Sequence, residues 1–375
     1  MLQGISLTLM IGPAVPIPAP RTVVEALTDV EVTVPTEGPS VFQLRFTLAK
    51  KSPLETLFLL AGGAVPPLLR VVLVATVNGQ PEVLADGVVT GTEIAPGSAD
   101  TLPTLTVRGE DLSRVMDYIE LDGLPYPAMP ALARVNLALL KYAVLGVIPL
   151  VIPPILMDVP IPVERIPVHQ GTDLAYIKRL AEEVGYVFYV EAGPVPGTSV
   201  AYWGPEVKVG VPQPALNTDM DAHTNVEALS FSIDTQDRAL PVLFIHNALT
   251  KVPIPIPVPD INPLAPPLGL VAPLPKRIEM LGDTAHLSPI QAAAMGIARA
   301  SRSSEVVRGS GSLDVLRYGR VLKARRLVGV RGAGQAFDGL YYVSSVTHRI
   351  KRGEFKQSFS LTRNGLISTV PRVPA

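Results

Sequence analysis

Apolar and polar residues alternate along much of this chain, and this period of two limits its fold more than any other feature. Residues 30–34 read VEVTV, and residues 42–48 read FQLRFTL. Successive side chains of a strand point to opposite faces, so such runs predict strands with one buried face. A chain in which these runs dominate is expected to fold as packed sheets with few helices.

Two hairpins are indicated by their turns. Asn78-Gly79 follows the predicted strand Arg70–Val77, and this dipeptide is the strongest short signal for a two-residue turn. Near the end of the chain, alternate residues from Tyr342 to Ile350 are predicted to share one face of a strand. Lys351–Glu354 then forms the turn, and Phe355–Leu361 returns as the second strand.

Helical signals are few. The best is Asp173–Val184, which Thr172 can cap at its start and Gly185 can end in a left-handed turn. A second helix is expected within Pro130–Val144, and a third at Ser288–Ser301, whose first serine is the expected N-cap. The predicted apolar face of the second helix consists of Leu137, Leu140 and Val144.

These signals divide the chain into three parts. Residues 1–108 are rich in predicted strands, residues 109–200 mix helices with strands, and residues 201–370 are again mainly strands. A proline-rich arm and a helix interrupt the last part at about 251–311. The predicted fold class is therefore mainly β with an α+β insertion.

Prolines alternate with valine and isoleucine in three stretches, at residues 15–20, 152–162 and 252–259. Proline has no backbone donor and a fixed φ, so these stretches are expected to be extended. One chain rarely buries so much apolar surface without regular structure. We therefore predict that these arms pack against neighbouring subunits.

The most apolar run is Tyr142–Met157. It is shorter than the roughly 20 residues that span a bilayer, and its prolines break a helix. A buried or interface segment is favoured over stable membrane insertion. Met1–Pro20 lacks a basic start and contains four prolines, so we expect no signal peptide and assembly in the bacterial cytoplasm.

Charge is unevenly spread along the chain. From Arg317 onward, 12 Lys and Arg face only Asp338 and Glu354, a net charge of +10, so the remainder carries −11 of the total of −1. Basic tails often contact nucleic acid. Here the charges lie within predicted strands, which favours a solvated sheet face or a charged interface over specific nucleic-acid binding.

Motifs that carry chemistry are absent or broken. The chain has no cysteine and no phosphate-binding glycine loop, and residues 332–337 (GAGQAF) lack the third glycine of a dinucleotide fingerprint. Asp219, Asp221 and His223 have a spacing that could face one cation, but a polar surface turn is the favoured interpretation. We predict no catalytic, cofactor-binding or metal-binding residues and no cofactor.

Three segments, taken in order, resemble one known family. They are Val89–Asp117, His169–Val190 (HQGTDLAYIKRLAEEVGYVFYV) and Phe337–Gly365 (FDGLYYVSSVTHRIKRGEFKQSFSLTRNG). Their order and spacing are similar to those of the phage late-control protein D family. That family comprises baseplate hubs of contractile tails and the N-terminal hub half of type VI secretion spike proteins.

The resemblance implies two tail-tube-like β-barrels, one in residues 1–108 and one in residues 201–370, with a small α/β domain at 109–200. It implies a homotrimer whose six barrels form a pseudo-six-fold ring. Such a hub would join the tail tube protein, or a tube-initiator ring, to a separate spike protein at the centre of the baseplate. A tape-measure protein and the baseplate wedge are further expected partners, and the expected location is the virion or injection particle.

Other functions remain open at this stage. A type VI-like secreted spike component would need a needle or effector extension, and the chain ends soon after the closing hairpin. A tail-associated cell-wall hydrolase would need paired carboxylates, but pairs such as Glu182-Glu183 resemble solvated helix faces. A structural protein that is not an enzyme is therefore the leading hypothesis. The sequence does not distinguish a phage from a bacteriocin or an extracellular injection system.

Overall fold

The structure is a computed structural model of the chain. It describes residues 4–48, 54, 58, 68–97, 102–154, 159–163, 166–234, 238–246, 253–260, 262–281, 289–370 and 373.

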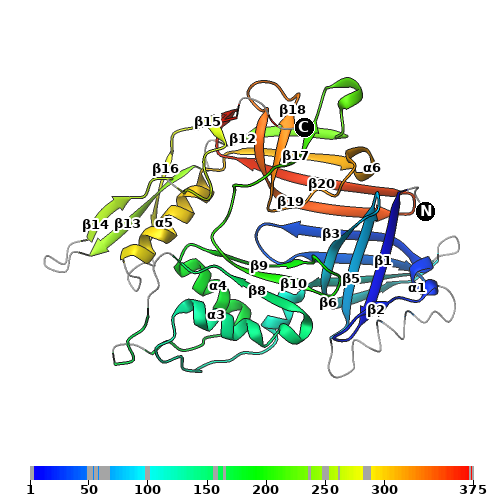
Figure 1. Ribbon diagram of the computed structural model, residues 1–375, viewed down its shortest axis with the longest axis horizontal. Coiled ribbons are helices and arrows are strands. Elements are labelled where there is room, and N and C mark those ends of the chain that lie inside the picture. The colour runs from blue at the N-terminus through cyan, green and yellow to red at the C-terminus, as the bar shows by residue number, and fades with distance from the viewer. Residues whose placement is uncertain are drawn as a thin grey trace.

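Most of the strands belong to one 13-stranded sheet that contains two four-stranded units (Figure 1). The first unit, in order across the sheet, consists of β3 (Leu27–Pro35), β4 (Val41–Thr47), β7 (Thr104–Asp111) and β6 (Gln80–Ala95). The second unit, in the same direction, consists of β12 (Ala228–Ile233), β17 (Val307–Asp314), β20 (Glu354–Arg363) and β19 (Gly339–Lys351).

The two units are repeats of one arrangement. In each, the first two strands in sequence are followed across the sheet by the last strand and then by the long third strand. A further strand pairs with the beginning of that long strand, namely β5 (Arg70–Val77) with β6 and β18 (Leu327–Arg331) with β19. A β-bulge interrupts each long strand, between Val89 and Gly91 in β6 and between Val343 and Ser345 in β19. The same strand order and the same bulge therefore occur twice.

The second unit joins the first edge to edge. β19 pairs antiparallel with β3 from Ser345 opposite Pro35 to Lys351 opposite Asp29. Residues of both units belong to one hydrophobic core, which includes Val32 and Phe42 of the first unit and Val346 and Phe359 of the second. The sheet and its core are thus continuous across the junction.

Short strands extend the sheet, and short helical turns connect some of its strands. They are β1 (Ile5–Gly12), β2 (Ile17–Pro18), α1 (Arg21–Ala26), β11 (Gln213–Asn217), η5 (Asp221–His223) and α6 (Val315–Tyr318). β1 pairs with β5 and β2, whereas β11 pairs parallel with β18.

An α/β unit packs against this sheet. Its elements are η3 (Leu112–Asp117), α3 (Ala131–Leu140), η4 (Ala143–Leu145), β8 (Val147–Val151), α4 (Asp173–Glu183), β9 (Val187–Ala192) and β10 (Ser199–Gly204). The strands form a three-stranded sheet in the order β8, β10, β9. Trp203 is fully buried here, and its indole nitrogen donates to the carbonyl of Ile177 at 3.3 Å. The unit therefore has a core of its own.

The interruption of the second unit forms a small projecting layer (Figure 1, left). Its elements are β13 (Ala239–His246), β14 (Pro253–Pro257), β15 (Gly269–Val271), β16 (Arg277–Leu281) and α5 (Pro289–Ser303), and β15 pairs with β21 (Leu366–Ser368) from the end of the chain. The proline-rich β14 is extended, as predicted, and pairs with β13 as an edge strand. Proline suits an edge because one side of the strand needs no donors.

Several sequence predictions are confirmed. The chain is mainly β. Asn78-Gly79 joins β5 to β6, and both residues have positive φ. The Thr172 hydroxyl accepts from the amide of Ala175 at the start of α4, and Gly185 follows that helix at φ +71°.

Other predictions need correction. Within the described residues no sheet closes into a barrel, because the strands of both units share one open sheet. The bulge at Ser344 reverses the alternation in β19, so Tyr342 does not share the core face with Val346. The apolar face expected of α3 is exposed: Leu140 is 60% exposed and Val144, just beyond the helix, is 78% exposed.

No helix in the described part of the chain is long and apolar enough to cross a membrane. The apolar run from Tyr142 instead contains η4 and the edge strand β8. The expected N-cap Ser288 lies outside the described residues, and α5 begins at Pro289.

Candidate functional site

The edge at which the two units join is stabilised on both faces of the sheet. On the polar face, the hydroxyls of Thr33 and Thr347 share a hydrogen bond at 2.9 Å, and Arg349 donates to Glu31 at 2.8 Å. On the core face, Val32 lies opposite His348, and both side chains are buried. Cross-strand pairs of this kind are the unit of sheet stabilisation.

The opposite edges of the two units are unjoined. In β6, residues 91–95 pair with β7 on one side, and within the described residues no strand pairs with their other side. β12 likewise pairs only with β17 among the described strands. Ile94 of β6 and Ile233 of β12 are each 41% exposed. Both edges therefore offer free backbone groups and apolar side chains, which makes them candidates for pairing with another chain.

The polar face of the two units carries balanced charge. Alternation places on this face the cations Arg45, Arg108, Arg308, Arg349, Lys351 and Lys356 and the anions Asp29, Glu31, Glu93, Glu110, Asp314 and Glu354. Several are paired across strands, as in Arg108 with Glu93 at 3.1 Å and Lys356 with Glu227 at 2.9 Å. The excess of basic residues in the last strands therefore does not produce a basic sheet face.

Other basic residues of the C-terminal segment bind within the chain. The guanidinium of Arg363, almost completely buried, donates to the carbonyls of Gly365, Asp338 and Ala336 at 2.7, 3.0 and 2.7 Å. It also lies 4.4 Å from the centre of the Tyr341 ring. Arg363 thus ties together the loops at one end of the second unit.

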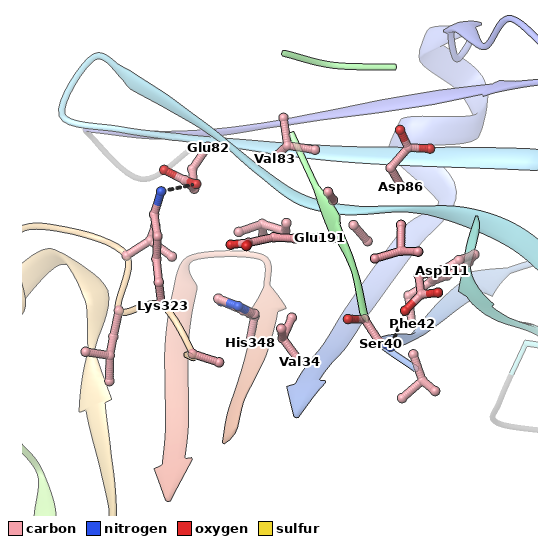
Figure 2. A pocket seen from close by; sticks show the side chains of 18 residues that line it. Val34, Ser40, Phe42, Glu82, Val83, Asp86, Asp111, Glu191, Lys323 and His348 are labelled. Carbon is pink, nitrogen blue, oxygen red and sulfur yellow. Dashed lines mark hydrogen bonds and ion pairs between the residues drawn. The ribbon is translucent and has the colours of Figure 1, made fainter. Parts of the chain in front are cut away.

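A small cavity lies where the two units meet the α/β unit (Figure 2). Figure 2 shows Lys323 reaching Glu82 at 2.6 Å on one side and Asp111 near Ser40 on the other. Asp111 accepts from the amides of Ser40 and Ser113 at 2.5 and 2.9 Å, and burial raises the pKa of its carboxyl. The volume of about 60 Å³ is suited to a few waters and is far below that of a substrate site.

His348 borders this cavity from β19 and belongs to a buried polar pair (Figure 2). Its Nδ1 accepts from the side-chain amide of Gln357 at 3.1 Å, because that amide also binds the backbone of Leu322 through both its oxygen and its nitrogen. Complete burial lowers the pKa of His348 to about 4. The imidazole is therefore neutral at physiological pH.

A buried ion pair connects the first unit to the α/β unit. Arg70 of β5 donates twice to Asp86 of β6, both at 2.6 Å, and the hydroxyl of Ser199 donates to Asp86 at 3.2 Å. Arg70 also donates to the carbonyls of Ala14 and Gly197, each at 2.9 Å. Burial raises the pKa of Asp86, although Arg70 acts in the opposite direction. This ion pair therefore holds the α/β unit against the first four-stranded unit.

The most catalytic-looking cluster surrounds His169 in the α/β unit. Its Nδ1 lies 3.0 Å from the Tyr126 hydroxyl, and its Nε2 lies 3.6 Å from a carboxylate oxygen of Asp173. Asp173 also binds the Tyr142 hydroxyl and the Lys141 ammonium, each at 2.6 Å. His169 is fully buried, and burial lowers its pKa. The cluster holds the first turn of α4 against the preceding loop, and sequence spacing alone gave no sign of it.

A larger cavity of about 270 Å³ adjoins Arg325, where β18 begins. The guanidinium of Arg325 lies 4.0 Å from the centre of the Tyr189 ring and donates to the carbonyl of Pro35 at 2.5 Å. Tyr189 stacks on Tyr202 at 4.9 Å. Arg325 therefore joins three parts of the chain, whereas its neighbour Arg326 is exposed.

The other candidates from the sequence lie apart from these contacts. Asp219, Asp221 and His223 lie in a loop around η5. Among the described residues, no group of three His, Asp or Glu side chains is arranged to hold a metal ion. Residues 332–337 form the loop between β18 and β19. Trp203, Tyr341 and Tyr342 are buried in the interior.

No protein-family model matches the sequence. No curated protein matches it either.

Solved structures do match the fold. A tail protein from Neisseria meningitidis MC58 superposes with a TM-score of 0.63 at 13% identity over 97% of this chain and 98% of that one. The 43 kDa tail protein of prophage MuSo2 from Shewanella oneidensis gives 0.59 at 14% identity over 96% and 98%. An Escherichia coli component of the type VI secretion system, described as similar to the T4 tail proteins gp27 and gp5, gives 0.53 at 12% identity over 93% and 76%.

Proposed function

We propose that this chain is a structural baseplate hub of a contractile phage tail or a related injection machine. It has the fold of phage tail proteins and of a type VI secretion component, so the family resemblance indicated by the sequence is confirmed at the level of fold. In this role it adapts a six-fold tail tube to a three-fold spike and catalyses no reaction.

The observation that carries this proposal is the repeated four-stranded unit. Each chain contains two units with the same strand order, joined edge to edge. Three copies would therefore present six similar units while keeping three-fold symmetry. Closed rings are the usual outcome for homo-oligomers, and such a ring matches a tube on one side and a spike on the other.

The remaining features are assigned on the same basis. Residues 1–108 and 201–370 would supply the tube-like parts, which close into barrel-like walls only in the ring, and residues 109–200 would lie outside them. The tail tube protein or a tube initiator, a separate spike, the tape-measure protein and the baseplate wedge are the proposed partners. The chain would assemble in the bacterial cytoplasm and reside at the centre of the particle.

The first test is the solution mass of the purified chain by light scattering, alone and with its candidate spike. A species of about 120 kDa, three times the 39.9 kDa chain, is expected. A complex with the spike that excludes the tube protein would contradict the adaptor role. Clearing of peptidoglycan in a zymogram would instead identify a hydrolase.

A further inference from the structure

We infer that β6 of one copy pairs antiparallel with β12 of the next, with Ile94 opposite Phe231. The partner is a second copy of this chain, and the inference rests on the self-assembly proposed above. It specifies the surface and the register of that assembly, neither of which the overall fold determines.

The register follows from matching the two units residue by residue. The bulge at Thr90 in β6 corresponds to the bulge at Ser344 in β19, which matches Ile94 with His348. Across the sheet, Val89 pairs with Gly109, Gly109 with Phe42, and Phe42 with Val32. The corresponding steps of the second unit lead from Val343 through Leu361 and Gly309 to Phe231. Val32 therefore corresponds to Phe231.

The junction within the chain then gives the junction between chains. His348 lies opposite Val32 where β19 joins β3. Replacing each residue by its counterpart places Ile94 opposite Phe231. The same correspondence gives the neighbouring pairs, which are Gly91 with Asp234, Thr92 with Ile233, Glu93 with Ser232, and Ala95 with Ser230.

This register is chemically consistent on both faces. On the core face, Ile94 and Ile233 are each 41% exposed in the single chain, and pairing would cover both next to Phe231. On the polar face, Glu93 meets a serine, so no like charges are opposed. A slip of one residue would turn Ile94 to the polar face, which disfavours registers displaced by one residue. Pro96 follows β6 and lacks a donor, which limits the length of the pairing.

The geometry of the contact leads to a closed assembly. Each copy has one β6 edge and one β12 edge, so the contact is head to tail and not between identical surfaces. Such contacts produce rings when the rotation between copies closes. The rotation is set by the chain itself, because β19 and β3 already join one unit to the next in the same way.

Disulfide trapping tests the register, since the natural chain has no cysteine. Directly opposite residues in an antiparallel pair have Cα atoms about 4.5–5.5 Å apart, which a disulfide can bridge. The full-length variant Glu93→Cys/Ser232→Cys is oxidised and analysed on a denaturing gel without reductant. The matched control is Glu93→Cys/Ser360→Cys, because β20 lies two strands beyond β12, about 10 Å further across the sheet.

The expected result is a ladder of covalent dimers and trimers in the first variant, reversed by reductant and at least tenfold weaker in the control. Circular dichroism melting of both reduced variants confirms that they are folded. No ladder, or an equal ladder in the control, overturns the register. If a ladder is absent but the chain is still trimeric and binds its spike, the register is wrong and the hub function stands. If the ladder forms but the chain joins no tail particle, the register is right and the hub function is wrong.

Discussion

Asp111 in the first unit and Arg363 in the second occupy the same position in the repeat and carry opposite charges. Both residues end the last strand of their unit, and both are buried. Asp111 accepts hydrogen bonds from the amides of Ser40 and Ser113. Arg363 donates hydrogen bonds to three loop carbonyls. At this position both units bind the loops at the strand end through one buried side chain. The side chain is a hydrogen-bond acceptor in the first unit and a donor in the second.

The two units differ in the side chains that bind the loops at their strand ends. A loop exposes amides or carbonyls at a strand end according to its backbone path, and the buried side chain must supply the missing partner. The strand order is shared because it determines how the units join. The side chains within each unit differ with the local loops, so the two units share a strand order but have different residues at equivalent positions.

The largest effect is expected for Arg363→Met. It leaves one buried and two partly buried carbonyls without a donor and removes the contact with Tyr341, so we expect a loss of about 3–4 kcal/mol in the free energy of unfolding. Asp111→Asn keeps one acceptor and should cost about 1–2 kcal/mol. Urea denaturation followed by circular dichroism measures both.

Arg363→Lys separates charge from geometry. A lysine keeps the charge but lacks the planar fork that reaches several carbonyls, so we expect it to lose most of what methionine loses. A lysine variant within about 0.5 kcal/mol of the natural chain would show that charge alone suffices, without the planar geometry of arginine.

A second difference lies inside the sheet, where His348 and Gln357 correspond to Ile94 and Leu105. Because burial lowers the pKa of His348 to about 4, the unfolded chain, with an ordinary histidine pKa near 6.5, binds a proton more readily than the folded chain. Stability from this group is present above pH of about 6.5 and is lost as pH falls toward about 4. The total is on the order of 3 kcal/mol.

His348→Ile, which copies the first unit, removes this acid sensitivity. The test compares urea midpoints at several pH values between about 7 and 4 for the two chains. The variant should change less with pH, apart from the shared contribution of other groups. Identical pH profiles would mean that His348 titrates normally in the folded chain.

A smaller effect distinguishes the adjacent arginines at the start of β18. Arg325→Glu removes the contacts with Tyr189 and Pro35, so we expect a loss of about 2 kcal/mol even in a monomer. Arg326→Glu, on the exposed side, should change stability by less than about 0.5 kcal/mol. Because Arg326→Glu should leave the chain stable, a lower yield of assembled particles with this variant would indicate a lost contact with a partner. Equal melting temperatures for both would contradict the contacts of Arg325.

The smallest effect on the isolated chain is expected at the unjoined edge. Ile94→Lys alters a partly exposed residue, so the free energy of unfolding should change by less than about 0.5 kcal/mol. Glu93→Gln, on the polar face of the same strand, serves as a control that keeps the apolar row intact. Light scattering should find that Ile94→Lys prevents trimer formation and Glu93→Gln does not. An intact trimer in Ile94→Lys would show that this edge is not the contact.

Local sequence signals predicted local structure well. The turn at Asn78-Gly79 and the capped helix that begins at Asp173 depend on a few adjacent residues, and both are present. The bulges at Thr90 and Ser344 were not predicted, because a bulge inserts one residue without changing which residue types alternate. That insertion reverses the faces on either side, which explains the wrong placement of Tyr342.

The alternation of apolar and polar residues could not predict contacts between segments that are distant in the sequence. β3 and β19 are adjacent in the sheet but lie near opposite ends of the sequence, and nothing in the alternation of either strand identifies its neighbour. The His169 cluster was missed for the same reason, since Tyr126, Tyr142 and Asp173 come together only when α3, α4 and their loops pack. The apolar side of α3 is exposed in the single chain. An apolar stripe therefore predicts a surface that favours contact, but the contact need not lie within the same chain.

The long connection between β12 and β17 has a consequence for how such proteins change over time. In the first unit, residues 36–40 link the corresponding strands β3 and β4, whereas in the second unit residues 234–306 do so. Closing a longer loop costs little additional entropy, and the sheet on both sides is the same. This position therefore accepts inserted sequence without loss of the strands on either side. It is the natural place for a lineage to acquire new attachments, and for an engineer to graft a foreign module.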